Sequence, residues 1–245
     1  MKNKLTTITT LHYVKLVLRS ILFVGALILY ILNFTISKEF INYLYIFLAG
    51  VWVVYAIEIF LRLFPSKIES PGCQKQFEKN YISNNIDAKP NIQSWKRTVA
   101  VLLSWIILNG IIGVLYLAGI IMQEILILIS LAYGVCDMMC ILFFCPFQTL
   151  IMKNRCCITC RIYNWDFAMM FTPFIFIPHF YTWSLLGMAL ILLLKWEITL
   201  KCHPERFATN TNDYISCKNC TEKLCYHKKQ LQSFIKKHKE RFWTK

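Results

Sequence analysis

The cysteines of this chain gather in two clusters whose spacing is typical of metal ligands. The first lies in the middle of the chain and consists of Cys145, Cys156, Cys157 and Cys160. The second lies near the C-terminus and consists of Cys202, Cys217, Cys220 and Cys225. A Cys-x2-Cys element lets two sulfurs turn onto one ion, and four thiolates complete the ligand set of tetrahedral zinc or of an iron–sulfur cluster. We therefore expect a cofactor site at the first cluster and a metal site at the second.

The spacing leaves the identity of the metal open between zinc and iron–sulfur. His203 and His227 flank the second cluster and favour zinc, because imidazole and thiolate together are common zinc ligands. The two parallel four-thiolate sets, with Cys156 and Cys157 adjacent in the first, favour iron–sulfur clusters. For the first cluster, loop thiols without a metal are the alternative.

A third group, Cys136, Asp137 and Cys140, lies inside an apolar run. On a helix the two sulfurs share one face, since four residues make about one turn. With nearby methionines they would form an intramembrane path for a soft metal, and packing as small hydrophobic side chains is the alternative. Glu58 is the other deep carboxylate, and Arg62 one turn later is its expected partner. Asp137 has no such local partner.

The elements that must position these residues are hydrophobic helices. The 245 residues are 57% hydrophobic and 16% charged, whereas a soluble domain has about 25% charged residues. Windows of about 19 residues mark apolar runs at 14–36, 41–64, 98–121, 124–146, 165–178 and 181–199. The fifth run contains Pro173 and Pro178 and is short for a bilayer of about 30 Å, so it is predicted to be a short or re-entrant span. The predicted fold class is all-α, a polytopic membrane helical bundle over residues 1–200 with about six transmembrane spans.

Charge predicts the orientation of these spans. With both termini in the cytoplasm, 26 of the 27 lysines and arginines lie inside, and only Lys38 lies outside. All eleven cysteines then lie at the inner face or in the inner half of the membrane, where reducing conditions exclude a disulfide framework. The prediction is a multi-pass protein of the inner (cytoplasmic) membrane.

The region after the last span is predicted to have two parts. Residues 201–227 form a small Cys-rich cytoplasmic metal-binding segment, and residues 228–245 form a basic amphipathic tail. Such a helix suits the anionic inner leaflet of the lipid bilayer. Because a basic juxtamembrane stretch already has this explanation, nucleic acid is not expected as a partner.

Five short motifs lie around the cysteines: Cys145-Pro146-Phe147, Lys153 to Arg161, Asn164-Trp165-Asp166, His203-Pro204-Glu205-Arg206-Phe207 and Cys217-Lys218-Asn219-Cys220-Thr221. This block resembles a group of uncharacterised small membrane proteins of anaerobic low-GC bacteria with cytoplasmic cysteine clusters. The resemblance covers roughly residues 130–230. It implies a bacterial inner membrane and carries no known activity.

Three functions follow from these features. The leading hypothesis is electron transfer through iron–sulfur clusters at the cytoplasmic face, from an acidic soluble donor to a membrane redox partner or quinone. The alternatives are a zinc-binding structural or regulatory membrane protein, and a soft-metal transporter. The chain has no glycine-rich phosphate loop, no His-Glu-x-x-His and no Gly-x-Ser-x-Gly, so these hydrolase and nucleotide-binding signatures are excluded. No catalytic residue is assigned.

Overall fold

The computed structural model describes residues 6–35, 41–84, 89–154, 156–222 and 224–225. The predicted basic tail, 228–245, and His227 lie outside the described residues. Five long helices dominate: α1 (Thr7–Thr35), α2 (Ile41–Leu63), α4 (Trp95–Leu117), α5 (Gln123–Leu142) and α7 (Phe180–Cys202). No strand is formed within the described ranges, where the single bridge joins Ser83 to Asn212. The all-α prediction is confirmed for this part of the chain.

Four of these helices are long and apolar enough to cross a membrane: Thr7–Leu32, Ile46–Leu63, Trp95–Leu117 and Gln123–Leu142. They indicate a membrane protein. Outward-facing side chains such as Ile28, Ile107 and Val114 are more than half exposed, which suits contact with lipid. The remaining helix, α7, has the same length as α2 and α4 but carries Lys195, Glu197 and Lys201 near its end.

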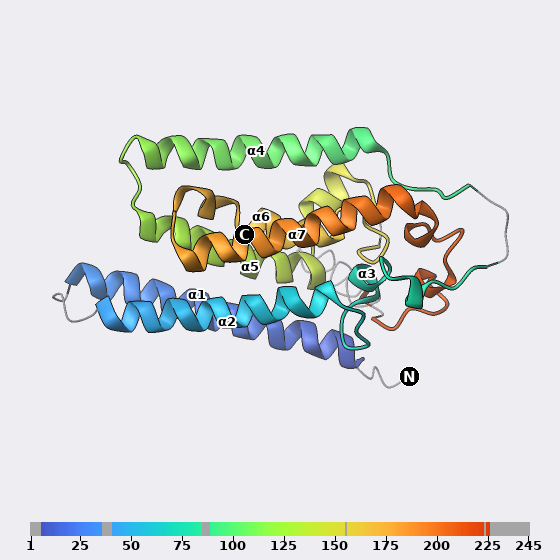
Figure 1. Cartoon of the computed structure of the whole chain (residues 1–245), viewed down its shortest axis with the longest axis horizontal. Helices are drawn as coiled ribbons and strands as arrows, with labels where there is room; N and C mark the ends of the chain where they lie inside the picture. The colour runs from blue at the N-terminus through green and yellow to red at the C-terminus, as the bar shows by residue number, and fades with distance from the viewer. Residues whose placement is uncertain (1–5, 36–40, 85–88, 155, 223, 226–245) are drawn as a thin grey trace, which may run out of the picture.

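The long helices run side by side in one bundle (Figure 1). In that view α1 and α2 lie along one edge, α4 lies along the other, and α5 and α7 pass between them. Helix α1 packs on α5, and α2 packs on α7. The long connections gather with the start of α1 at one end of the bundle, which we call the loop end (Figure 1). It contains α3 (Pro71–Gln74), η2 (Glu78–Asn80), η3 (Phe147–Ile151), η4 (Tyr163–Trp165), η6 (Pro204–Phe207) and η7 (Asp213–Ile215).

The predicted fifth span is not a continuous helix. It consists of two five-residue pieces, α6 (Asp166–Met170) and η5 (Thr172–Phe176), with Pro173 in the first turn of the second piece. Asp166 pairs with Arg62 at the end of α2, whereas the Phe176 ring lies 6.1 Å from that of Tyr116 at the far end of α4. The segment therefore runs through the interior from the loop end to the opposite end. Its irregular backbone is covered by α4, α5 and α7.

This irregular segment also forms the centre of the core. Phe167, Phe171 and Phe174 are almost fully buried, with neighbouring ring centroids 6.3 and 5.2 Å apart. Helix α4 packs mainly on η5 and η3 rather than directly on another long helix. Gly113 makes this packing possible, because a Cβ there would overlap the Phe176 ring.

Three predicted boundaries are corrected by the structure. The first helix begins at Thr7 rather than residue 14, so it includes polar residues such as Thr9 and His12 that precede the apolar run. The fourth long helix, α5, ends at Leu142 rather than residue 146, because Pro146 cannot continue a regular helical ladder. Helix α4 begins three residues earlier than expected, after Ser94. Segment boundaries in sequence windows follow apolar runs, whereas helices extend into the polar interface.

Candidate functional site

Five cysteines from separate parts of the sequence line one cavity at the loop end of the bundle. We call this the thiol cavity; its volume is about 150 Å³. The cysteines are Cys136, Cys140, Cys145, Cys157 and Cys160. The first two come from one face of α5, as their spacing predicted, and the last two come from the loop that precedes η4. Other walls are formed by aromatic and thioether side chains: Trp105, Tyr133, Phe147, Met169 and Met170.

The sulfurs of this cavity are held by specific contacts. Cys140 and Cys145 are hydrogen-bonded to each other. The Gln148 amide oxygen, oriented toward the backbone, accepts from the N–H groups of Cys156 (3.3 Å) and Cys157 (3.2 Å). The other end of that amide then lies 2.9 Å from Cys157 Sγ and donates to it. Burial raises the pKa of the Cys160 thiol to about 12, so this sulfur is a neutral thiol at physiological pH.

A second, smaller pocket lies next to the thiol cavity and joins the two predicted clusters. We call it the tail pocket; its volume is about 10 Å³. Its sulfurs belong to Cys156, Cys157, Cys220 and Cys225. A hydrogen bond between Cys156 and Cys225 lowers the pKa of Cys156 to about 6 and raises that of Cys225. Cys157 lines both cavities, so the thiols form one continuous group.

The start of α1 fixes the chain that carries Cys220 and Cys225. Thr9 Oγ1 donates to the backbone carbonyl of Glu222 over 2.6 Å. The Glu222 carboxylate lies 3.2 Å from His12 Nε2, and both side chains are nearly fully buried. This anchoring explains how a short Cys-rich segment takes a defined position without a core of its own.

The remaining members of the predicted metal set lie elsewhere. Cys202 and Cys217 are exposed and line neither the thiol cavity nor the tail pocket. The tail pocket therefore groups half of each predicted cluster, whereas the thiol cavity holds three cysteines of the first cluster: Cys145, Cys157 and Cys160. Among the described residues, which exclude His227, no group of three or more Cys, His, Asp or Glu side chains is already arranged to hold a metal ion.

An ion cluster next to the thiol cavity was not expected from the sequence. Arg19 is completely buried and lies 2.5 Å from Glu58 on α2 and 2.8 Å from Asp137 on α5. It also donates to the Gly134 carbonyl over 2.9 Å. The expected Glu58–Arg62 pair is therefore wrong as the main contact of Glu58, and Asp137, which lines the thiol cavity, has a cationic partner.

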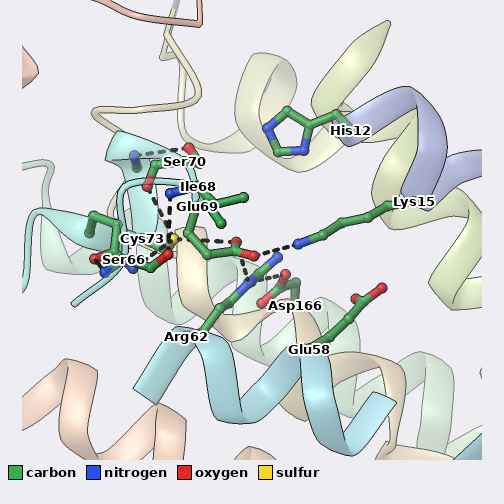
Figure 2. A network of polar contacts seen from close by, with 12 residues as sticks. His12, Lys15, Glu58, Arg62, Ser66, Ile68, Glu69, Ser70, Cys73 and Asp166 are labelled. Atoms are coloured by element: carbon green, nitrogen blue, oxygen red, sulfur yellow. Dashed lines mark hydrogen bonds and ion pairs between the residues drawn. The ribbon is translucent and has the colours of Figure 1, made fainter. Parts of the chain in front are cut away.

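Arg62 belongs instead to a second buried chain of ions. Figure 2 shows its guanidinium between Asp166 and Glu69, with Lys15 of α1 reaching the same Glu69. The Lys15 Nζ to Glu69 Oε1 distance is 2.7 Å. The Phe167 ring lies 4.6 Å from the Arg62 guanidinium carbon, so a cation–π contact adds to the ion pairs. Because Asp166 also lines the thiol cavity, both ion clusters fix its walls.

A sequence signal for these clusters did exist. Arg19, Glu58 and Asp137 each lie in an apolar run, where a charged group is costly to bury alone. The three residues were therefore candidate ion-pair partners. The local i,i+4 rule drew attention to Arg62 instead. Long-range pairing depends on which helices are neighbours, and a single sequence does not give that arrangement.

Chemically, the two cavities present soft sulfur donors. Thiolate and thioether sulfurs select zinc, copper(I) and iron–sulfur clusters over hard cations. Paired thiols at hydrogen-bonding distance are also suited to two-electron thiol–disulfide exchange. Comparisons with protein-family models, with curated proteins and with solved structures found no match, so its own residues are the basis for assigning a function.

Proposed function

We propose that this chain is an integral membrane metal–thiolate protein whose centre is held at the loop end by Cys156, Cys157, Cys220 and Cys225. The supporting observation is that these four cysteines, from segments some sixty residues apart, line one small pocket. Cysteines that are only partly buried in short loops have little to gain from packing, whereas metal binding would itself stabilise the fold of such loops. Coordination requires the Cys220–Cys225 turn to close on Cys156 and Cys157.

The size of the tail pocket favours zinc over an iron–sulfur cluster. Its free volume of about 10 Å³ matches a single water-sized sphere. One ion with four sulfur ligands at about 2.3 Å fits such a space, whereas a cluster with several iron and sulfide atoms needs more room. At this pocket the function is therefore structural or regulatory, with the metal fastening the Cys-rich segment to the bundle.

Topology is the second element of the proposal. The loop end faces the cytoplasm of a bacterial inner membrane, because nearly all of the basic residues fall in sequence segments that are cytoplasmic in this orientation. In this arrangement the segment from Asp166 to Ile177 is a crossing made of two short helical pieces, buried among α4, α5 and α7. It preserves the six-crossing parity predicted from charge, with α7 as the final span.

A second function is favoured by the thiol cavity. Its aromatic and apolar walls suit a quinone ring, and the hydrogen-bonded Cys140 and Cys145 stand at its edge. When two thiols form a disulfide they release two electrons and two protons, which a quinone takes up to become a quinol. An acidic soluble donor, attracted by the basic loop end, would then restore the thiols.

One experiment separates these possibilities. The full chain is purified in mild detergent, without oxygen or chelator, and zinc and iron are measured per chain by mass spectrometry. We expect about one zinc, lost in the Cys156→Ser/Cys157→Ser variant and retained in the matched Cys202→Ser/Cys217→Ser variant. Protein without metal that forms a Cys140–Cys145 disulfide on addition of quinone would support the redox function instead.

Loss of zinc in the Cys202/Cys217 variant, with retention in the Cys156/Cys157 variant, would contradict the proposed ligand set. Iron with a visible absorption band that bleaches on reduction would replace zinc by an iron–sulfur cluster.

A further inference from the structure

A large polar cavity lies at the loop end, apart from the thiols. Its volume is about 470 Å³, within the range of small-molecule sites. The chain before α4, the turn after η3, the loop before η4 and the end of α7 enclose it. Four cationic side chains line it: Lys75, Arg97, Lys153 and Arg161. Among the described residues of this lining, none is Asp or Glu. We call it the cationic cavity.

Carboxylates neutralise only part of this charge. Arg161 lies 2.7 Å from Glu197, whereas Arg97 donates to the Met152 carbonyl over 3.1 Å. Lys75 is completely buried and donates to the carbonyls of Ile158 (2.7 Å) and Cys160 (3.1 Å). These neutral carbonyls replace only part of the hydration that the Lys75 ammonium loses on burial. An anion in the cavity would supply the missing negative charge.

Two backbone features add to the positive potential in the cationic cavity. Ser94, which lines the cavity, is the N-cap of the 23-residue helix α4, and its hydroxyl makes no capping bond. The free N–H groups and dipole at such a helix start favour anions. Lys153, which also lines the cavity, has φ of 50°, a left-handed conformation uncommon for residues other than glycine.

Neutral hydrogen-bonding groups complete the lining. They are Asn91, Gln93, Asn154, Thr159 and Thr209. The exposed Trp95 beside the cavity lies under Arg161, with the guanidinium carbon 4.7 Å from the ring centroid. From Trp95 the apolar outer face of α4 continues with exposed Leu102, Leu103 and Ile106. The cavity therefore adjoins both the aqueous loop end and the surface that we assign to lipid.

We propose that the cationic cavity binds a phosphate group, carried either by an anionic phospholipid headgroup or by a soluble phosphate ester. Phosphate oxygens suit both the Arg97 and Arg161 forks and the point charges of Lys75 and Lys153. This site is independent of the metal centre, but it touches the same loop, because Lys75 holds the carbonyls of Ile158 and Cys160.

The test uses the full chain stripped of lipid in detergent, with thermal unfolding and calorimetry as readouts. Inorganic phosphate and pyrophosphate are compared with chloride at equal ionic strength. In parallel, the chain is placed in nanodiscs of phosphatidylcholine, with and without phosphatidylglycerol, and bound lipid is counted by native mass spectrometry. Binding of the free anions indicates a soluble ligand, and selective retention of phosphatidylglycerol alone indicates a headgroup.

The decisive variant is Arg97→Gln/Lys153→Gln. Both native side chains are exposed, so their replacement should not prevent folding. We expect binding to weaken at least about tenfold, the effect of roughly one lost charge-assisted hydrogen bond. The matched control, Lys201→Gln/Lys218→Gln, removes two exposed cations from the loop end but outside the cavity. Its binding should change less than about twofold. Absence of binding to both probes, or equal loss in the two variants, would overturn the proposal.

Discussion

The buried Arg19 cluster predicts a large and specific loss of stability on replacing Arg19 by Met. The change would leave Glu58 and Asp137 without the cation that bonds to both, with only 8% and 17% of their side-chain surfaces exposed. Breaking a buried ion pair by removing one partner typically costs about 3–5 kcal/mol. For a chain of this size, 1 kcal/mol corresponds to about 2–4 °C in the unfolding temperature, so we expect a decrease of about 6–20 °C.

A compensated variant isolates the charge effect from the loss of packing. Arg19→Met combined with Glu58→Gln and Asp137→Asn removes the unpaired charges and should recover at least half of the lost stability. As the control, Glu78→Gln breaks the pair between Arg206 and an 85% exposed carboxylate. Surface pairs contribute about 0–1 kcal/mol, so this change should shift the unfolding temperature by no more than about 4 °C.

The buried thiol of Cys73 provides the assay. It is completely buried, and it reacts with a fluorogenic maleimide only after the loop end unfolds. Once the accessible thiols of the native protein, such as Cys202, have been blocked with N-ethylmaleimide, a thermal ramp of detergent-solubilised protein reports the midpoint for all three variants. If Arg19→Met unfolds within about 4 °C of the native chain, or if the compensated variant is no more stable than the single one, the ion cluster does not have this role.

Three further predictions follow from the loop end. In native protein at pH 8, N-ethylmaleimide should modify exposed Cys202 within minutes and leave Cys73 unmodified, because burial raises the pKa of Cys73 to about 12. Peptide mass spectrometry after quenching measures the modification of both cysteines. In a variant that keeps only Cys156 and Cys225, mild oxidation of metal-free protein should give an intramolecular disulfide, and its absence would show that the two segments do not meet. Alkaline phosphatase fused after Lys245 should be inactive if the C-terminus is cytoplasmic, whereas strong activity would reverse the proposed orientation.

The helical architecture was the most predictable part of the molecule. Apolar runs marked α2 and α7 closely, because a helix that faces lipid must be hydrophobic over most of its length. The two prolines were the reason for dividing the last apolar run into a short fifth segment and a sixth, and in the structure the chain breaks there between η5 and α7. The path of the fifth segment from Arg62 to Tyr116 could not be derived, because it depends on how three helices pack around it.

The site was predictable in residue type but not in grouping. Sequence spacing joined Cys220 and Cys225 to Cys202 and Cys217, whereas in the structure they face Cys156 and Cys157. The difference arises from the contact between Glu222 and the first turn of α1, which is separated from it by more than two hundred residues. Local spacing contains no information about such a contact.

The central claim is that sulfurs from two distant segments bind one metal ion. X-ray absorption at the metal edge tests it most directly on the full chain purified without chelator. We predict a zinc edge with a first shell of four sulfurs at about 2.3 Å, reduced in sulfur count when Cys156 alone is replaced by His. A first shell of nitrogen and oxygen only, or four sulfurs that are unchanged in the Cys156→His variant, would contradict the account.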